Sequence, residues 1–192
     1  MAKKALDTLY FDARYIRVDH HDGISRFSAG LCDAISQQMK TIAIISDERQ
    51  LKSLPAGIEH ILLNDPTSPI AELFIARKLN ALGAKLVFSP MQTMGTWGRK
   101  YKLLLTLHDL IYYAHPAPPP SMPLFIRIGW RLFHSVYWPQ RLVLNQADAI
   151  VTVSETTKRL INQHRLTKRQ VHVVYNAAAH VHEQHKNAHN RP

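Results

Sequence analysis

Short apolar runs alternate with helix-forming segments along most of the chain, and this alternation limits the fold more than any other feature. Residues 41–46, TIAIIS, form a continuous run rich in β-branched residues, which suits a strand buried on both faces of a parallel sheet. Comparable runs lie at residues 4–15, 58–63, 85–90, 101–107, 149–154 and 171–176. Strands separated by helices predict βαβ units. We therefore expect an α/β fold with an open, Rossmann-like parallel sheet and helices on both faces.

The segments between these runs carry helix signals. Apolar residues recur at three- and four-residue steps from residue 24 to residue 35, which predicts a helix with Ser25 as its N-cap. Residues 64–85 predict a second helix, which ends at Gly83 in a left-handed conformation. Ser154 is placed to cap a third helix.

A proline-rich loop at residues 115–123 precedes a largely helical segment, residues 124–148, with a break near Pro139. This segment mixes aromatic residues with arginines, as interfacial membrane helices do. A helix that covers a sheet also needs a broad apolar face. We favour a place in the core, and docking at a membrane surface is the alternative.

The charge of the chain is strongly positive. Lysine and arginine number 24 against 14 aspartate and glutamate residues, a formal net charge of +10. Such a field favours anionic partners, namely nucleic acid, an anionic membrane surface or phosphorylated small molecules, although it also aids solubility.

The cysteine content and the distribution of apolar residues bear on the cellular compartment. A single cysteine, Cys32, excludes an internal disulfide and fits a reducing compartment. The N-terminal residues have no apolar core of a secretory signal, and no run approaches the roughly 18 apolar residues of a spanning helix. We expect a cytoplasmic protein.

Ligands of open parallel sheets bind at the carboxyl ends of the strands, where this chain offers two candidate loops. The first precedes the helix expected at Ser25. Gly23 allows close backbone approach, the helix directs free amides outward, and Arg26 adds charge, which together suit a phosphate group. Neither G-x-G-x-x-G nor G-x-x-x-x-G-K-[ST] is present, which argues against classical dinucleotide binding and P-loop ATPase activity.

The same loop contains the sequence DHHD, residues 19–22, which raises the question of a metal site. Adjacent His20 and His21 would project in different directions from an extended segment, so both rarely reach one ion. We expect no metal here. Four histidines near the C-terminus, between residues 180 and 189, are read as part of a solvated linker.

The second candidate loop begins with His108, directly after the apolar run of residues 103–107. A histidine at a strand end can orient a substrate hydroxyl or hydrogen-bond a phosphate or sugar oxygen. It can equally cap the strand and bond only to backbone, and both interpretations remain open. Asp109 is expected to orient the loop.

Four segments in order resemble a known family. They are FDARYI with DGISRFSAGL, then LLLTLHDLIYYAHP, ADAIVTVSETTKRLI and VHVVYNA. Together they resemble the N-terminal half of retaining glycosyltransferases of the GT-B fold, in glycosyltransferase family 4. The resemblance extends from about residue 9 to residue 176.

This resemblance implies one half of a GT-B fold, in which two Rossmann-like domains face a cleft. The N-terminal domain binds the acceptor, a carbohydrate or a lipid-linked molecule, and the C-terminal domain binds most of the nucleotide-sugar donor. It implies that His108 lies near the transferred sugar, without a metal or other cofactor. It further implies that the Gly23 loop approaches the donor diphosphate and the acceptor. We predict His108 as the catalytic residue. The predicted loop residues are Gly23, Ile24, Ser25 and Arg26, and the predicted supporting residues are Asp109 and Ser154.

The resemblance also sets expected domain boundaries. Residues 1–176 are expected to form the Rossmann-like domain and residues 177–192 a linker toward a C-terminal donor domain, whose E-x7-E motif the sequence lacks. Ala177 stands where the family usually has a glycine after Asn176. Because catalysis requires donor and acceptor held together, we expect little activity from the chain alone.

The expected location is the cytoplasm or the inner face of the membrane. The alternative function is a non-catalytic Rossmann-like module that binds nucleic acid or a protein partner. We rank it lower because the cations are scattered apart from clusters such as residues 165–169.

Overall fold

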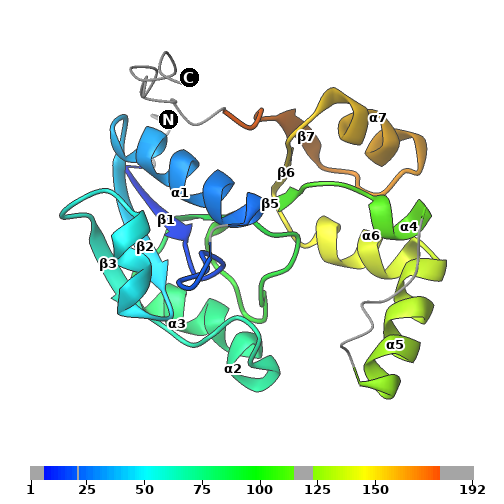
Figure 1. The fold of residues 1–192 in the computed structure, drawn as a ribbon, viewed down its shortest axis with the longest axis horizontal. Coiled ribbons are helices and arrows are strands. Elements are labelled where there is room, and N and C mark those ends of the chain that lie inside the picture. The colour runs from blue at the N-terminus through cyan, green and yellow to red at the C-terminus, as the bar shows by residue number, and fades with distance from the viewer. Residues whose placement is uncertain (1–6, 21, 115–122, 178–192) are drawn as a thin grey trace, which may run out of the picture.

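The computed structural model describes residues 7–20, 22–114 and 123–177, and these form an α/β fold around one seven-stranded sheet (Figure 1). Every strand pair is parallel, and the strand order is β3-β2-β1-β4-β5-β6-β7. The strands are β1 (Thr8–Asp12), β2 (Lys40–Ile45), β3 (Glu59–Leu62), β4 (Leu86–Ser89), β5 (Lys102–Leu107), β6 (Ala149–Thr152) and β7 (Gln170–Val173). The predicted fold class and all seven predicted strands are confirmed.

Helices cover both faces of this sheet. They are α1 (Gly23–Ser36), α2 (Pro69–Leu73), α3 (Ile75–Ala81), α4 (Ile111–Ala114), α5 (Leu124–Ser135), α6 (Trp138–Asn145) and α7 (Glu155–Gln163), with a 3₁₀ helix at Glu48–Ser53. Alternate residues of β1 point into two separate core clusters. Leu9 packs in one cluster with Phe27 of α1, whereas Tyr10 packs in the other with Leu79 of α3 and Leu144 of α6.

The N-cap of helix α1 lies three residues earlier than the sequence predicts. Asp22, rather than Ser25, is the N-cap, and its Oδ1 accepts a hydrogen bond of 2.8 Å from the backbone N–H of Ser25. An aspartate side chain at this position satisfies an amide that the helix cannot satisfy itself. The predicted Ser154 cap of α7 is confirmed, since its Oγ accepts from Thr157 N at 3.1 Å.

The helix predicted over residues 64–85 is divided into α2 and α3 at Phe74. The loop at Gly95 packs closely on α2, because a Cβ atom at Gly95 would lie 1.8 Å from the carbonyl oxygen of Glu72. Gly83 has a φ of +77°, as predicted for the left-handed position after α3.

The segment after residue 123 forms two helices. The break falls at residues 136–137, and Pro139 lies in the first turn of α6, where a missing N–H costs little. Gln140 and Leu144 of α6 are buried against the sheet. The prediction that the whole segment belongs to the core is wrong for α5, which extends away from the sheet and exposes apolar side chains (Figure 1).

Within the described part of the chain, no helix is both long and apolar enough to cross a membrane.

Candidate functional site

A cavity of about 420 Å³ opens at the carboxyl edge of the sheet. It is lined by residues 14–20 after β1, by residues 46–47 and 49–50 after β2, and by residues 65–67 after β3. This is the edge at which open parallel sheets bind ligands, because the loops that follow neighbouring strands meet there. The cavity lies beside the first candidate loop predicted from the sequence.

A buried ion cluster lies at the carboxyl end of β1, next to this cavity. The guanidinium of Arg14 bonds to Asp12 through Nε at 2.7 Å and to Glu72 through Nη1 at 2.8 Å. Burial alone would lower the pKa of Arg14, but the charges and hydrogen bonds of Asp12 and Glu72 outweigh it and raise that pKa. Arg14 is therefore a fixed cation in the wall of the cavity.

Sequence reasoning missed this cluster. Its only local signal is a charged pair, Asp12 and Arg14, at the end of an apolar strand. The third member, Glu72, is 58 residues away from Arg14 in the sequence, so no spacing rule points to it.

The loop between β1 and α1 is tied to the start of the helix. The backbone N–H of Arg17 donates to the hydroxyl of Ser25 at 3.0 Å, and its side-chain Nε lies 2.9 Å from Asp22 Oδ2. Burial opposes ionisation of Asp22, yet the hydrogen bonds from Ser25 and the charge of Arg17 lower its pKa overall. These contacts tie Arg17 to the entrance of α1.

The predicted donor-phosphate residues occupy the first turn of α1. Gly23 and Arg26 are exposed, Ile24 is half-buried and Ser25 is fully buried. The hydroxyl of Ser25 therefore supports the loop from inside, whereas Gly23 and Arg26 lie at the surface. Their roles toward a donor stay predictions.

His108 lies half-buried at the end of β5. Its Nε2 is 2.8 Å from the carbonyl oxygen of Pro90, and its ring meets the ring of Phe27 edge-on at a centroid distance of 5.0 Å. A carbonyl oxygen only accepts, so Nε2 is the donor in this hydrogen bond. This bond agrees with the backbone alternative left open by the sequence, and the role of His108 toward a ligand stays a prediction.

The predicted supporting residues organise the backbone around His108. Thr157 Oγ1 donates to the carbonyl oxygen of His108 at 3.2 Å and lies 2.9 Å from Ser154 Oγ, which caps α7. Asp109 Oδ1 accepts from the N–H of Ile111 at 2.9 Å and starts α4. Thr157 was not singled out from the sequence, although it follows the predicted cap by three residues.

The tertiary structure joins the two predicted loops through α1. Phe27, which contacts the ring of His108, directly follows the predicted phosphate-binding turn. His108 and that turn consequently lie at the same edge of the sheet, as a shared site requires.

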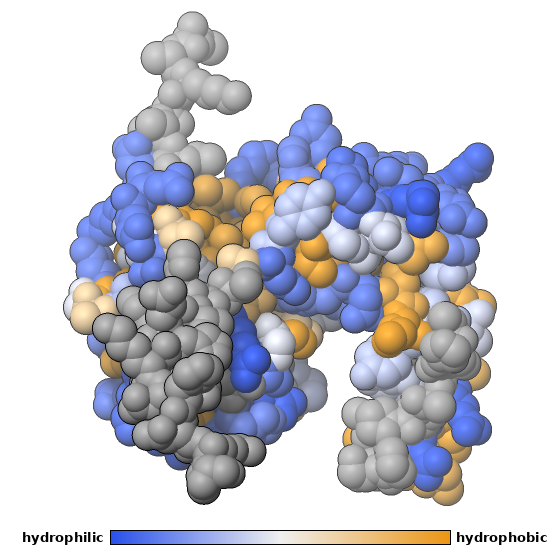
Figure 2. Space-filling view, turned by 45° about the horizontal axis from the view of Figure 1, so that its top comes forward, coloured by the Kyte–Doolittle hydropathy of each residue, from blue (hydrophilic) through white to orange (hydrophobic). Residues whose placement is uncertain are grey.

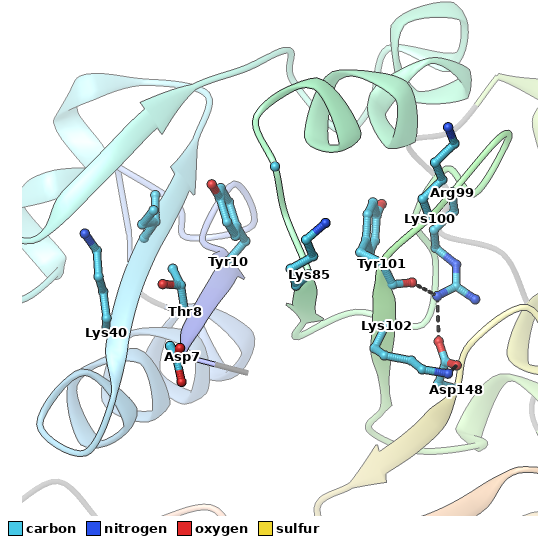
Figure 3. Close-up of a pocket in the computed structure, with 12 residues that line it drawn as sticks. Asp7, Thr8, Tyr10, Lys40, Lys85, Arg99, Lys100, Tyr101, Lys102 and Asp148 are labelled. Carbon is cyan, nitrogen blue, oxygen red and sulfur yellow. Dashed lines mark hydrogen bonds and ion pairs between the residues drawn. The ribbon is translucent and has the colours of Figure 1, made fainter. Parts of the chain in front are cut away.

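The larger cavity, about 820 Å³, lies at the opposite, amino edge of the sheet (Figure 3). Its cationic lining residues are Lys40, Lys85, Arg99, Lys100 and Lys102. Asp148 binds Arg99 at 2.5 Å and Lys102 at 2.8 Å. Despite some burial, these bonds and one from Leu103 N lower its pKa to about 2. Size alone favours this cavity, but the ligand edge of a parallel sheet is the other one.

Two residues of the DHHD segment have partners within the loop. Asp22 caps α1, and His20 Nε2 lies 3.2 Å from Arg17 Nη1, while His21 is outside the described residues. No group of three or more His, Cys, Asp or Glu side chains among the described residues is placed to hold a metal ion. The histidines near the C-terminus and most of the predicted linker, residues 178–192, are likewise outside the described residues.

The parallel sheet with helices on both faces defines a Rossmann-like α/β domain, whose cavity, helix entrance and histidine lie at one edge. The family model described as Glycosyltransferase Family 4 matches residues 46–179, more than half of the chain. The chain therefore belongs to glycosyltransferase family 4. The match includes His108, Asp109 and Ser154, whereas the loop before α1 lies outside it. No curated protein matches the chain.

Proposed function

We propose that this chain is the acceptor-side domain of a GT-B glycosyltransferase that transfers a sugar from a nucleotide-sugar to an acceptor hydroxyl with retention. Membership of glycosyltransferase family 4 supports transfer of a sugar. The retaining mechanism rests on the resemblance of the four sequence segments. The alternative of a nucleic-acid or protein-binding module is not favoured by the family match.

The observation that carries the proposal is the placement of His108. Its Nε2 bonds to Pro90 O and its ring packs edge-on against Phe27, which fixes the imidazole at the carboxyl end of β5. In the proposed complex, Nδ1 accepts a hydrogen bond from a hydroxyl of the transferred sugar. A fixed ring orients that sugar without reorganisation during the reaction.

The departing diphosphate gains negative charge as the sugar–oxygen bond breaks. The first turn of α1 offers the backbone N–H groups of Gly23 and Ile24, which precede the capped amide of Ser25. Helix N-termini and cationic side chains stabilise such charge, so Arg26 would add to this effect. We propose no metal for this step.

The cavity of about 420 Å³ is the proposed acceptor site. Its lining combines Arg17, His20 and Arg49 with the carboxylates of Asp19 and Asp65. A mixture of donors and acceptors suits the hydroxyl groups of a carbohydrate or of the head of a lipid-linked acceptor. A second Rossmann-like domain would supply most of the donor contacts.

The test uses the chain fused to the donor-binding domain of another family 4 enzyme. The fusion is incubated with radiolabelled nucleotide-sugars and a panel of carbohydrate and lipid-linked acceptors. We expect transfer from one donor class, with the anomeric configuration retained in the product by NMR. Inverted product would refute retention. The absence of transfer by a folded fusion, whose donor domain still binds its nucleotide, would refute the proposed function.

A further inference from the structure

Helix α5 exposes a row of apolar side chains. Leu124, Ile128 and Leu132 are spaced by four residues, so they lie along one side of the helix. Their exposed fractions are 71%, 53% and 66%. Burying such side chains stabilises a protein by about 1.5–3 kcal/mol each, and this chain leaves that stabilisation unused. Contiguous exposed apolar surface usually marks an interaction site.

The opposite side of α5 holds it to the rest of the molecule. The ring of Trp130 meets the ring of Tyr112 edge-on at 4.9 Å, next to the contact between α4 and α5. At about 100° per residue, Trp130 and Ile128 lie roughly 160° apart around the helix. The apolar row therefore faces away from this contact, and Figure 2 shows the region as a projecting arm with hydrophobic and hydrophilic surface.

The charges beside the row are all positive. Arg127 and Arg131 each precede a member of the row by one residue, which places them along its edge. Between Asp109 and Asp148 the sequence contains no acidic residue. Arg141 of α6 does not belong to this face, because its guanidinium donates to the carbonyl oxygens of His164 and Arg165 at the end of α7.

We propose that α5 docks the protein on an anionic lipid bilayer. The row would enter the boundary between headgroups and acyl chains, while Arg127 and Arg131 contact lipid phosphates. Twelve residues of helix extend about 18 Å, less than the roughly 30 Å of a bilayer core, so α5 lies along the surface. Burial of the apolar row and attraction of the two arginines to anionic lipid both contribute to binding of the bilayer. This proposal does not depend on the proposed sugar transfer.

The test is cosedimentation of the full chain with vesicles of phosphatidylcholine alone or with one quarter phosphatidylglycerol. We expect binding to the anionic vesicles that weakens in 0.5 M NaCl, and much less binding to phosphatidylcholine alone. Substituting Leu124, Ile128 and Leu132 with Ser should weaken binding on the order of tenfold or more. Arg127→Gln with Arg131→Gln should remove the preference for anionic vesicles. The control replaces three exposed apolar residues of other elements, Leu62, Ile70 and Leu82, with Ser.

Equal binding by the wild type and the Leu124/Ile128/Leu132 variant would overturn the proposal, as would an equal loss in the control. Failure of the wild type to bind anionic vesicles would also overturn it. A dimer that dissociates in the α5 variant, seen by light scattering without vesicle binding, would instead assign the face to a second copy of the chain. Circular dichroism checks that each variant is folded.

Discussion

The ring of His108 meets the ring of Phe27 edge-on, with 5.0 Å between their centroids, and this contact joins the loop after β5 to helix α1. The hydrogen bond from Nε2 to Pro90 O holds the same ring to the loop after β4. Three segments thus fix one imidazole at the carboxyl edge of the sheet. This preorganisation is what a group that orients a substrate requires.

Replacing His108 with Ala should reduce sugar transfer by about 100-fold, because the acceptor at Nδ1 is removed while the fold is kept. The measurement is kcat/KM of the chain fused to a donor domain. His60→Ala is the matched control, since His60 is exposed on β3 and its ring also faces a backbone carbonyl, that of Ile58 at 3.3 Å. Near-normal turnover in a folded His108→Ala variant would exclude the proposed role.

Replacing Arg14 with Met should destabilise the protein by about 3–5 kcal/mol, because two carboxylates lose their buried partner. The control is Lys40→Met, which breaks the exposed ion pair with Glu59 and should change stability by less than about 1 kcal/mol. Urea unfolding monitored by circular dichroism measures both. Equal losses would mean that the Arg14 cluster is no more important than a surface pair.

Replacing Gly95 with Ala should destabilise the protein by about 1–3 kcal/mol, because its Cβ would lie 1.8 Å from Glu72 O and the backbone must move. Gly30→Ala is the matched control, for which we expect the opposite effect on stability. Gly30 lies within α1 with open space around the added methyl group, so this change should stabilise by about 0.5–1 kcal/mol. Thermal unfolding of the two variants tests the pair, and a stabilising Gly95→Ala would contradict the close packing on α2.

The stability contributed by Asp148 should depend on acidic pH. Its pKa falls from 3.8 to about 2 in the folded protein, despite the opposing effect of burial, through bonds from Lys102, Leu103 N and Arg99. Because folding lowers this pKa, the ionised carboxylate of Asp148 stabilises the folded protein above about pH 4. This stabilisation is lost as the pH falls toward 2 and the carboxylate becomes protonated. With allowance for solvent screening, the contribution is about 1 kcal/mol.

The test compares Asp148→Asn with the wild type between pH 7 and pH 2. We expect the difference in unfolding free energy to be largest at neutral pH and to shrink below pH 4. Asp33→Asn, at an exposed position of α1, is the control. A difference that stays constant across this range would show that the ionised form of Asp148 is not what stabilises the fold.

Much of the fold could be predicted from local patterns. Apolar runs such as residues 41–46 marked the strands, and Ser154 and Gly83 marked the ends of helices, because these signals depend on neighbouring residues alone. His108 could be placed at the ligand edge because it directly follows an apolar run. The contacts that hold its ring could not be predicted, since Pro90 and Phe27 reach it only in the folded chain.

Other features required contacts between distant residues. Arg14 meets Glu72 across 58 positions, which no periodicity encodes. The exposure of α5 could not be predicted either, because an amphipathic pattern states that one face is apolar but not what covers it.

The sequence by itself therefore determined the alternation of strands and helices, the parallel sheet and the edge of the sheet at which we expect ligands. Hydrophobic period and helix capping are local, so they can be read along the chain. Only the tertiary structure decided which side chains meet at that edge and which apolar face remains uncovered. Those outcomes depend on how separate segments pack, and packing is a property of the whole fold.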